Sequence, residues 1–172
     1  MVTKITEIEK MTRPSDNRQH PRDPARTIEV LYQIAEAVSS TRNLEELYAV
    51  IHQSLGHILK VDNFYIAVHD AQNDTVSFPY HVDNRSSLPD EIADFSRSTS
   101  STAWVINNKK PAIFYDEQIQ PLAKLDPNNR EEFPKIWLGV PLVIGSRVIG
   151  AMVVQSYESR TEYEKEDLEL LN

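Results

Sequence analysis

Five histidines and no cysteine limit the chemistry that this chain of 172 residues could perform. Without cysteine it can form no disulfide, no thiolate metal site, no thiol nucleophile and no thioether to a cofactor. His52 and His57 lie five residues apart in an expected helix and so point to different faces, a spacing that does not suit a metal site. No Ser–His–Asp pattern, carboxylate pair or glycine-rich phosphate loop stands out, and we expect no catalysis.

The best single candidate for contacting a ligand is His81, at the end of an expected strand. It could ligate a haem, but a lone histidine at a strand end is more often hydrogen-bonded or solvent-facing, so we disfavour haem and leave the cofactor unknown. Further polar and aromatic candidates are Tyr65, Ser77, Tyr80, Trp104 and Trp137. Tryptophans of this kind are more often core residues than pocket residues, and alternation does not decide which sheet face holds a pocket.

The segment 137–158, "WLGVPLVIGSRVIGAMVVQSYE", has the pattern of a β-hairpin that is apolar on both faces. Gly145 and Ser146 suit a two-residue type II′ turn, which sets Pro141 opposite Gly150. Two apolar faces indicate central strands that are covered on both sides. One face lacks bulky side chains, and we expect a shallow dent there, floored by Gly139, Pro141 and Gly150.

The overall composition is that of an ordinary globular domain, with 40% hydrophobic and 26% charged residues. With 18 basic and 26 acidic residues the net charge is −8, which argues against nucleic acid as the main partner. No apolar run reaches the roughly 18 residues of a membrane span, and no signal-peptide core is present. We therefore expect a cytoplasmic protein without membrane contact from this segment.

Two helices are expected to position the strands. Residues 1–25 are polar and proline-rich, as in a flexible linker or tail, and a helix then begins at Arg26. That helix carries two apolar stripes, which predict two neighbours, its own sheet and a partner subunit of a homodimer. The members of the stripes are Ile28, Leu31, Ala35 and Val38, and Val30, Ile34 and Ala37. Asn43 caps a second helix, which we expect to continue to Lys60.

Strands dominate the rest of the chain, so the sheet should be largely antiparallel. Expected strands cover 63–69, 75–82 and 112–115 in addition to the hairpin, and Ser100 or Ser101 caps a short helix between them. The polar stretch 117–135 has the length of a functional or disordered loop. A last helix, 161–172, is capped by Thr161 and reaches Asn172 with its apolar repeat unfinished, as if an output domain followed.

These strings, in this order, resemble a GAF domain of the type found in bacterial sensor histidine kinases and diguanylate cyclases. The strings are "NFYIAVHD" at 63–70, "TVSFPYHVDN" at 75–84, "AWVINNKKP" at 103–111, the hairpin at 137–158 and "YEKEDLELL" at 163–171. With the two leading helices, the resemblance covers residues 26–172. It departs from the family where Ser100, Ser101 and Thr102 stand in place of the usual Gly-Leu-Thr, and no cyclic-nucleotide pattern is present.

The resemblance implies an α+β fold related to profilin and PAS domains. Its antiparallel sheet has five or six strands, with N- and C-terminal helices on one face and a ligand pocket under loops on the other. The implied function is small-molecule sensing in a signalling homodimer, with an output domain after Asn172; the alternative is a dimerisation or spacer module without a ligand. Because cysteine is absent, neither a bilin thioether nor the thiol chemistry of free methionine sulfoxide reductases is possible. The eight candidate ligand-binding residues are Tyr65, Ser77, Tyr80, His81, Trp104, Trp137, Gly139 and Gly150.

Overall fold

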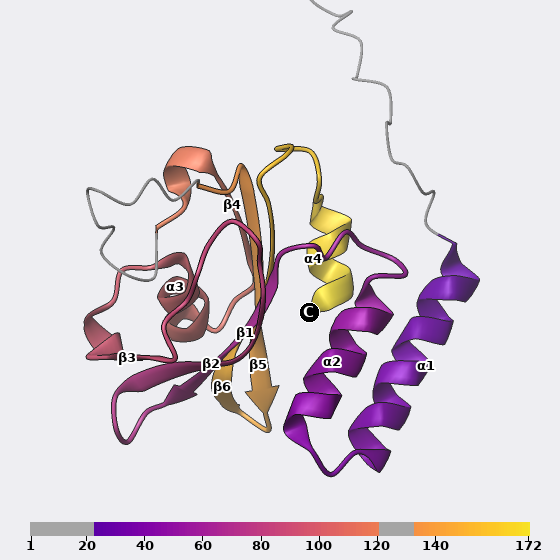
Figure 1. The fold of residues 1–172 in the computed structure, drawn as a ribbon, viewed down its shortest axis with the longest axis horizontal. Helices are drawn as coiled ribbons and strands as arrows, with labels where there is room; N and C mark the ends of the chain where they lie inside the picture. The colour runs from indigo at the N-terminus through magenta and orange to yellow at the C-terminus, as the bar shows by residue number, and fades with distance from the viewer. Residues whose placement is uncertain (1–22, 121–132) are drawn as a thin grey trace, which may run out of the picture.

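The computed structural model describes residues 23–120 and 133–172, which form an antiparallel sheet with helices on both faces (Figure 1). The strands are β1 Phe64–Asp70, β2 Thr75–Val82, β3 Glu91–Ala93, β4 Ala112–Tyr115, β5 Ile136–Ile144 and β6 Arg147–Ser156. The helices are α1 Pro24–Ser40, α2 Leu44–Leu55, α3 Ser101–Asn108 and α4 Lys165–Leu171, with single 3₁₀ turns η1 Phe95–Arg97 and η2 Asp116–Gln118. The expected tail, 1–25, lies mostly outside the described residues.

The sheet has six strands in the order β3-β2-β1-β6-β5-β4, all pairs antiparallel, which confirms the expected fold class. Helices α2 and α4 lie on one face and α3 on the other, while α1 packs on the outer side of α2 (Figure 1). We refer to the two sides of the sheet as the α3 face and the α2/α4 face. The middle strands β1 and β6 are buried because both faces are covered.

Each face has its own hydrophobic core. On the α2/α4 face, the alternate residues Phe64 and Ile66 of β1 pack with Leu138 and Val140 of β5 and with Tyr163, just before α4. The α3 face is built from the intervening residues of the same strands and from α3, and its buried members include many aromatic side chains. Its buried strand members are Tyr65, Ala67, Val76, Ala112, Trp137, Ala151 and Val153. Phe64, Ile66 and Val68 of β1 thus share the α2/α4 face.

Helix α1 begins two residues before the expected Arg26, because the Asp23 side chain accepts a hydrogen bond from the Ala25 backbone amide and Pro24 suits the first turn. One of its two apolar stripes is covered: Val30 and Ala37 are buried against the rest of the fold. The other stripe is exposed in this single chain, at Ile28, Leu31, Tyr32 and Val38. No helix within 23–120 or 133–172 is long and apolar enough to cross a bilayer.

A β-bulge makes the expected hairpin register wrong by one residue. The turn is as expected: Gly145 has φ 62° and Ile144 pairs with Arg147. The register then shifts between Leu142 and Val143, so that Pro141 pairs with Ala151 instead of Gly150. Beyond the bulge, every β6 side chain points to the face opposite to the one expected.

The expected dent is therefore not formed by a single surface. Gly139 lies on the α3 face, where it pairs with Val153, whereas Gly150 pairs with Val68 and shares the α2/α4 face with Met152. Gly150 is required for close strand approach, because a Cβ there would overlap the carbonyl oxygen of Ala67. Gly139 and Gly150 consequently serve two different packing layers.

The helix ends and the smallest strand also differ from the expectations. Helix α2 ends at Leu55 instead of Lys60, because the chain continues in tight turns in which the amides of His57 and Ile58 donate to the carbonyls of Ser54 and Leu55. The final helix is capped by Glu164 and Asp167 rather than by Thr161, which lies in the preceding turn. Strand β3 was not expected, since its three residues carry a single large apolar side chain, Ile92.

Candidate functional site

The α3 face brings together polar side chains from two strands and one helix. Tyr65 lies on β1, Trp137 on β5 and Thr102 on α3, which Ser100 caps by accepting a hydrogen bond from the Ala103 backbone amide. All of them are buried, and they surround the centre of the core on this face. The site is therefore placed by the sheet and is covered by α3.

A chain of hydrogen bonds holds these groups in fixed positions. The Tyr65 hydroxyl lies 2.8 Å from Thr102 Oγ1, and the indole Nε1–H of Trp137 donates to the Tyr65 oxygen at 3.1 Å. Burial raises the pKa of the Tyr65 phenol to about 12, against the smaller opposing effect of these hydrogen bonds. The phenol is therefore neutral and acts as a rigid polar centre within an aromatic surround.

Trp137 fills the space above Gly139 on the same strand. A Cβ at residue 139 would overlap the six-membered ring of the indole, so the glycine is what allows the ring to lie flat against the strand. The ring also packs against Phe114, with centroids 5.5 Å apart. The part of the expected dent that lies on this face is occupied by the protein's own tryptophan.

His81 lies on the same face as Tyr65, because the two residues pair across β2 and β1. Its Nε2 atom is buried and has no hydrogen-bond partner within the described residues, although the ring itself is half-buried. Burial lowers the pKa of the imidazole, and the nearby Asp83 carboxylate opposes this only in part. The neutral imidazole thus presents one buried nitrogen that no described protein group satisfies.

The Asp83 carboxylate, two residues after His81, is held by several donors. Its Oδ2 accepts hydrogen bonds from Gln155 Nε2 at 2.6 Å and from the Tyr157 hydroxyl at 2.9 Å. Its Oδ1 accepts from the backbone amides of Arg85 and Ser86. Burial would raise the pKa of the carboxyl, but these hydrogen bonds outweigh burial and hold the pKa below its usual value. A fixed negative charge therefore lies next to His81.

Three of the eight expected site residues lie on the other face of the sheet. The Tyr80 hydroxyl is 2.9 Å from His52 Nδ1 and packs under α2, and Gly150 lies beside Val68. Ser77, which pairs with Val68, shares that face. For Tyr80 and Ser77 the cause is a second bulge, since the pairing of β2 with β1 shifts between Ile66 and Val68. For Gly150 the cause is the bulge in the β5–β6 hairpin.

The remaining five expected residues are on the α3 side, but they do not form one cluster. Tyr65, Trp137 and Gly139 are in contact, and His81 lies beside Tyr65 with ring centroids 6.4 Å apart. Trp104 is 41% exposed on α3, and its ring meets the edge of Phe114 instead of the polar centre. Within 23–120 and 133–172, no group of three or more His, Cys, Asp or Glu side chains could hold a metal ion.

Comparison with known protein families shows which family the chain belongs to. The family model described as "GAF domain" matches residues 41–172, which is more than half of the chain. The chain belongs to the GAF domain family. No curated protein sequence matches it closely enough to count as a relative.

Solved structures with the same fold come from proteins of several kinds. The GAF domain of a phosphoenolpyruvate-protein phosphotransferase from Coxiella burnetii has 20% identity and a TM-score of 0.65, with 86% of each chain covered. A phycocyanobilin-bound GAF domain from a cyanobacterial phytochrome has 15% identity and a TM-score of 0.62, covering 84% of this chain and 87% of that one. A free methionine-R-sulfoxide reductase from Neisseria meningitidis, in complex with its substrate, has 16% identity, a TM-score of 0.60, and 88% and 86% coverage.

Several polar residues of this GAF domain site were not anticipated from the sequence. Thr102, Asp83, Gln155 and Tyr157 converge on the α3 face although they come from separate segments. The alternation of β6 could have placed Gln155 and Tyr157 on one face together, since they are two residues apart. Their pairing with Asp83 has no local signal, because it crosses 72 and 74 residues of sequence.

Proposed function

We propose that this GAF domain senses a small molecule on its α3 face as part of a bacterial signalling protein. The observation that carries the proposal is the buried Nε2 of His81, which has no hydrogen-bond partner among residues 23–120 and 133–172 and lies beside the aromatic ring of Tyr65. A buried polar atom without a partner costs about 1–3 kcal/mol, and a hydrogen bond from a ligand would remove that cost. His81, Tyr65 and Trp137 are the expected contacts.

The relatives of known structure support a ligand on this fold. Among the solved structures of this fold, one GAF domain is bound to phycocyanobilin and one reductase is in complex with its substrate. A thioether-linked bilin is not available to this chain, which has no cysteine. We propose that the ligand is held by non-covalent contacts. The neutral His81 imidazole and the neighbouring aromatic rings would select which molecules bind.

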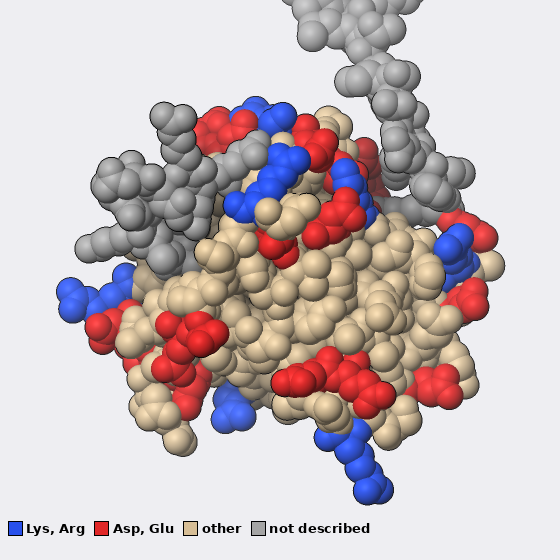
Figure 2. Space-filling view, in the orientation of Figure 1, with Lys and Arg blue, Asp and Glu red and all other residues tan. Residues whose placement is uncertain are grey.

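The proposed signal leaves through the terminal helices of a homodimer. Three apolar side chains of α1 are 69%, 48% and 57% exposed, at Ile28, Leu31 and Val38, and they lie at helical spacing. Figure 2 shows mostly uncharged side chains over the centre of the face that carries α1 and α2, with acidic groups along its lower edge. A second copy packed on α1 would bury this stripe and place the α4 helices to drive an output domain, a histidine kinase or a diguanylate cyclase in the cytoplasm.

A spacer module that binds no ligand is the second candidate. It is favoured by one observation, the Trp137 indole that occupies the space above Gly139. In this alternative the α3 face is filled by its own side chains, and the domain only holds two copies together through α1.

Ligand binding to matched histidine variants separates the two candidates. The purified chain would be screened by thermal shift against nucleosides, nucleotides, amino acids and tetrapyrroles. Sensing predicts that at least one compound raises the melting temperature of the wild type and that His81→Ala abolishes the shift. His57→Ala is the matched control, because His57 lies beside Arg26 of α1, away from the α3 face. If no compound binds, the spacer is favoured. If a compound shifts both variants as it shifts the wild type, the ligand does not contact His81 and the proposed site is wrong.

A further inference from the structure

The end of β2 is tied to the end of β6 although the two strands are not neighbours. In the sheet, β1 lies between them. Asp83, the first residue after β2, reaches past the start of β1 and accepts hydrogen bonds from Gln155 and Tyr157 at 2.6 and 2.9 Å. The sheet ladder itself provides no direct connection between these two strand ends, so the Asp83 carboxylate makes one.

The second half of this connection leads to α4. The backbone carbonyl of Gln155 accepts from the Tyr163 hydroxyl at 3.3 Å, and the same hydroxyl donates to the Lys60 carbonyl at 2.7 Å. Tyr163 lies two residues before α4 and packs in the core of the α2/α4 face. The Gln155 side chain thus meets Asp83 on the α3 face, while its carbonyl meets a residue that anchors the last helix on the other face.

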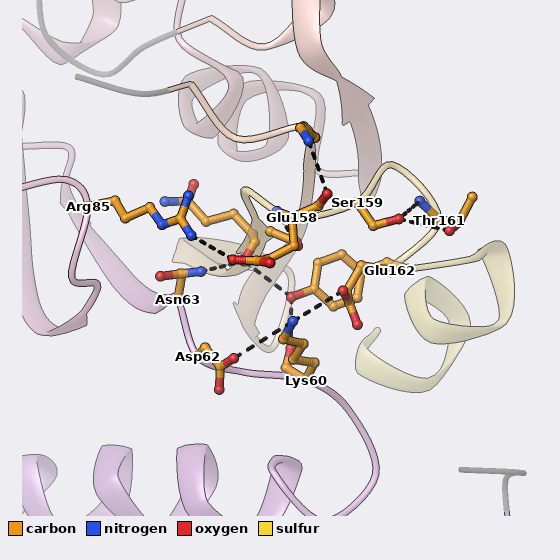
Figure 3. A network of polar contacts seen from close by, with 12 residues as sticks. Lys60, Asp62, Asn63, Arg85, Glu158, Ser159, Thr161 and Glu162 are labelled. Carbon is orange, nitrogen blue, oxygen red and sulfur yellow. Dashed lines mark hydrogen bonds and ion pairs between the residues drawn. The ribbon is translucent and has the colours of Figure 1, made fainter. Parts of the chain in front are cut away.

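Contacts around this path hold the β6–α4 segment in place (Figure 3). Arg85 pairs with Glu158 at 2.6 Å and lies over the Tyr157 ring, 5.4 Å from its centroid. Lys60 pairs with Glu162 at 3.4 Å. These outer pairs are partly exposed and contribute little by themselves. The inner part differs, because Gln155 and Tyr157 are 7% and 2% exposed. Without Asp83 the Tyr157 hydroxyl would lose its acceptor, and Gln155 Nε2 would keep only the Tyr157 oxygen at 3.0 Å.

We propose that Asp83 is a latch that couples the α3-face site to the segment 155–164 and so to α4. The inference rests on the proposed function, because it gives the route by which an occupant next to His81 would act on the terminal helix. His81 and Asp83 are two residues apart, so a shift of the His81 backbone on binding would move the carboxylate away from Gln155 and Tyr157. Loss of those hydrogen bonds would loosen the segment that precedes α4.

Asp83→Asn tests the latch because it changes the Oδ2 atom, which accepts hydrogen bonds from Gln155 and Tyr157 and from the Ser86 hydroxyl of the local turn. The Oδ1 oxygen that accepts from the Arg85 and Ser86 amides can be kept, whereas an amide nitrogen in place of Oδ2 would face the donating Nε2 of Gln155. Asp70→Asn is the matched control. Asp70 caps the β1–β2 turn in the same way, through the amides of Gln72 and Asn73, and its other oxygen bonds only to Asn73 of the same turn.

Hydrogen exchange of the ligand-free chain gives the readout. We expect Asp83→Asn to speed amide exchange about tenfold at residues 155–171 as well as at 83–88. Asp70→Asn should change exchange only near 70–75. Acceleration confined to 83–88 in Asp83→Asn would overturn the latch. Because no ligand is present, that outcome leaves small-molecule sensing untouched, and a failed ligand screen leaves this measurement valid.

A second variant tests the coupling from the opposite end. Tyr157→Phe removes a single hydroxyl and preserves the ring under Arg85, so it should fold even if Asp83→Asn does not. Coupling is reciprocal, and we expect exchange at residues 83–88 to rise severalfold in Tyr157→Phe. Unchanged exchange there would show that Asp83 and β6 are independent and would overturn the proposal.

Discussion

The indole of Trp137 lies flat against Gly139, two residues further along β5, in the space that a side chain at 139 would need. The same ring donates a hydrogen bond to Tyr65 at 3.1 Å, so its position is fixed from both ends. Side chains two residues apart share one face of a strand, and this contact is possible only because one of the two is glycine. The relationship sets the shape of the α3 face.

Gly139→Ala should destabilise the fold, because the new Cβ would overlap the indole and force it off its rotamer. We expect a loss of about 1–3 kcal/mol in the free energy of unfolding, measured by urea denaturation, with a red shift of tryptophan emission. Trp137→Phe removes the overlapping ring, so the double variant should recover part of the loss, by about 1 kcal/mol or more.

Gly150→Ala is the control for this cycle. Its Cβ would overlap the carbonyl oxygen of Ala67 on the neighbouring strand, and Trp137 has no part in that contact. Trp137→Phe should therefore give no recovery in the Gly150→Ala background. Equal recovery in both backgrounds would contradict a specific Trp137–Gly139 contact.

Strand positions were predictable from the sequence, whereas the faces of the strands were only partly so. The alternation of 75–82 and the apolar run 112–115 gave the bounds of β2 and β4, because apolar patterning and turn residues are local signals. A bulge depends on the partner strand. The shifts at Ile66/Val68 and Leu142/Val143 carry no local signal, and each one reverses the faces of the residues that follow.

The candidate site shows the same division. Tyr65, His81, Trp137 and Gly139 were expected and lie on one face, because strand type and residue chemistry suggested them independently of register. Tyr80, Ser77 and Gly150 are on the other face, since their placement depended on register. Contacts such as Asp83 with Tyr157 depend on tertiary structure alone. Whether the expected residues bind a ligand stays a prediction.

Tyr65→Phe should lower stability at neutral pH and change its alkaline dependence. The variant leaves Trp137 Nε1–H without its acceptor, at a cost of about 1–3 kcal/mol. Burial raises the pKa of Tyr65 from 10.0 to about 12 in the folded chain, so its contribution is complete below pH 10 and is lost as the pH rises through about 12.

Urea denaturation at two pH values checks the direction of this pH dependence. The difference in the free energy of unfolding between wild type and Tyr65→Phe should narrow by about 1 kcal/mol from pH 8 to pH 11. Only the wild type must keep this phenol neutral in the folded state. The other buried tyrosines are present in both proteins and cancel in the difference. A constant gap would mean that the Tyr65 phenol is not held in a buried environment.

His81 should make the fold sensitive to acid. Burial lowers its pKa below the ordinary 6.5, so the neutral form favours the folded chain above pH 6.5. That stability is lost as the pH falls through the lower folded pKa. His81→Gln cannot take up the proton, and its free energy of unfolding should fall less between pH 7 and pH 5 than that of the wild type. An imidazole titration midpoint at or above 6.5 by NMR would contradict the burial of His81.

The exposed stripe of α1 predicts a homodimer that one charge should break. Leu31 is 48% exposed between Ile28 and Val38, and a glutamate there would be desolvated at a two-fold contact. Light scattering should give the mass of a dimer for the wild type and of a monomer for Leu31→Glu, with unchanged circular dichroism. Ile144→Glu is the matched control, because Ile144 is 64% exposed at the tip of the β5–β6 hairpin and should leave the dimer intact. A monomeric wild type would contradict the predicted homodimer. A dimer that only Ile144→Glu disrupts would place the contact surface elsewhere than on α1.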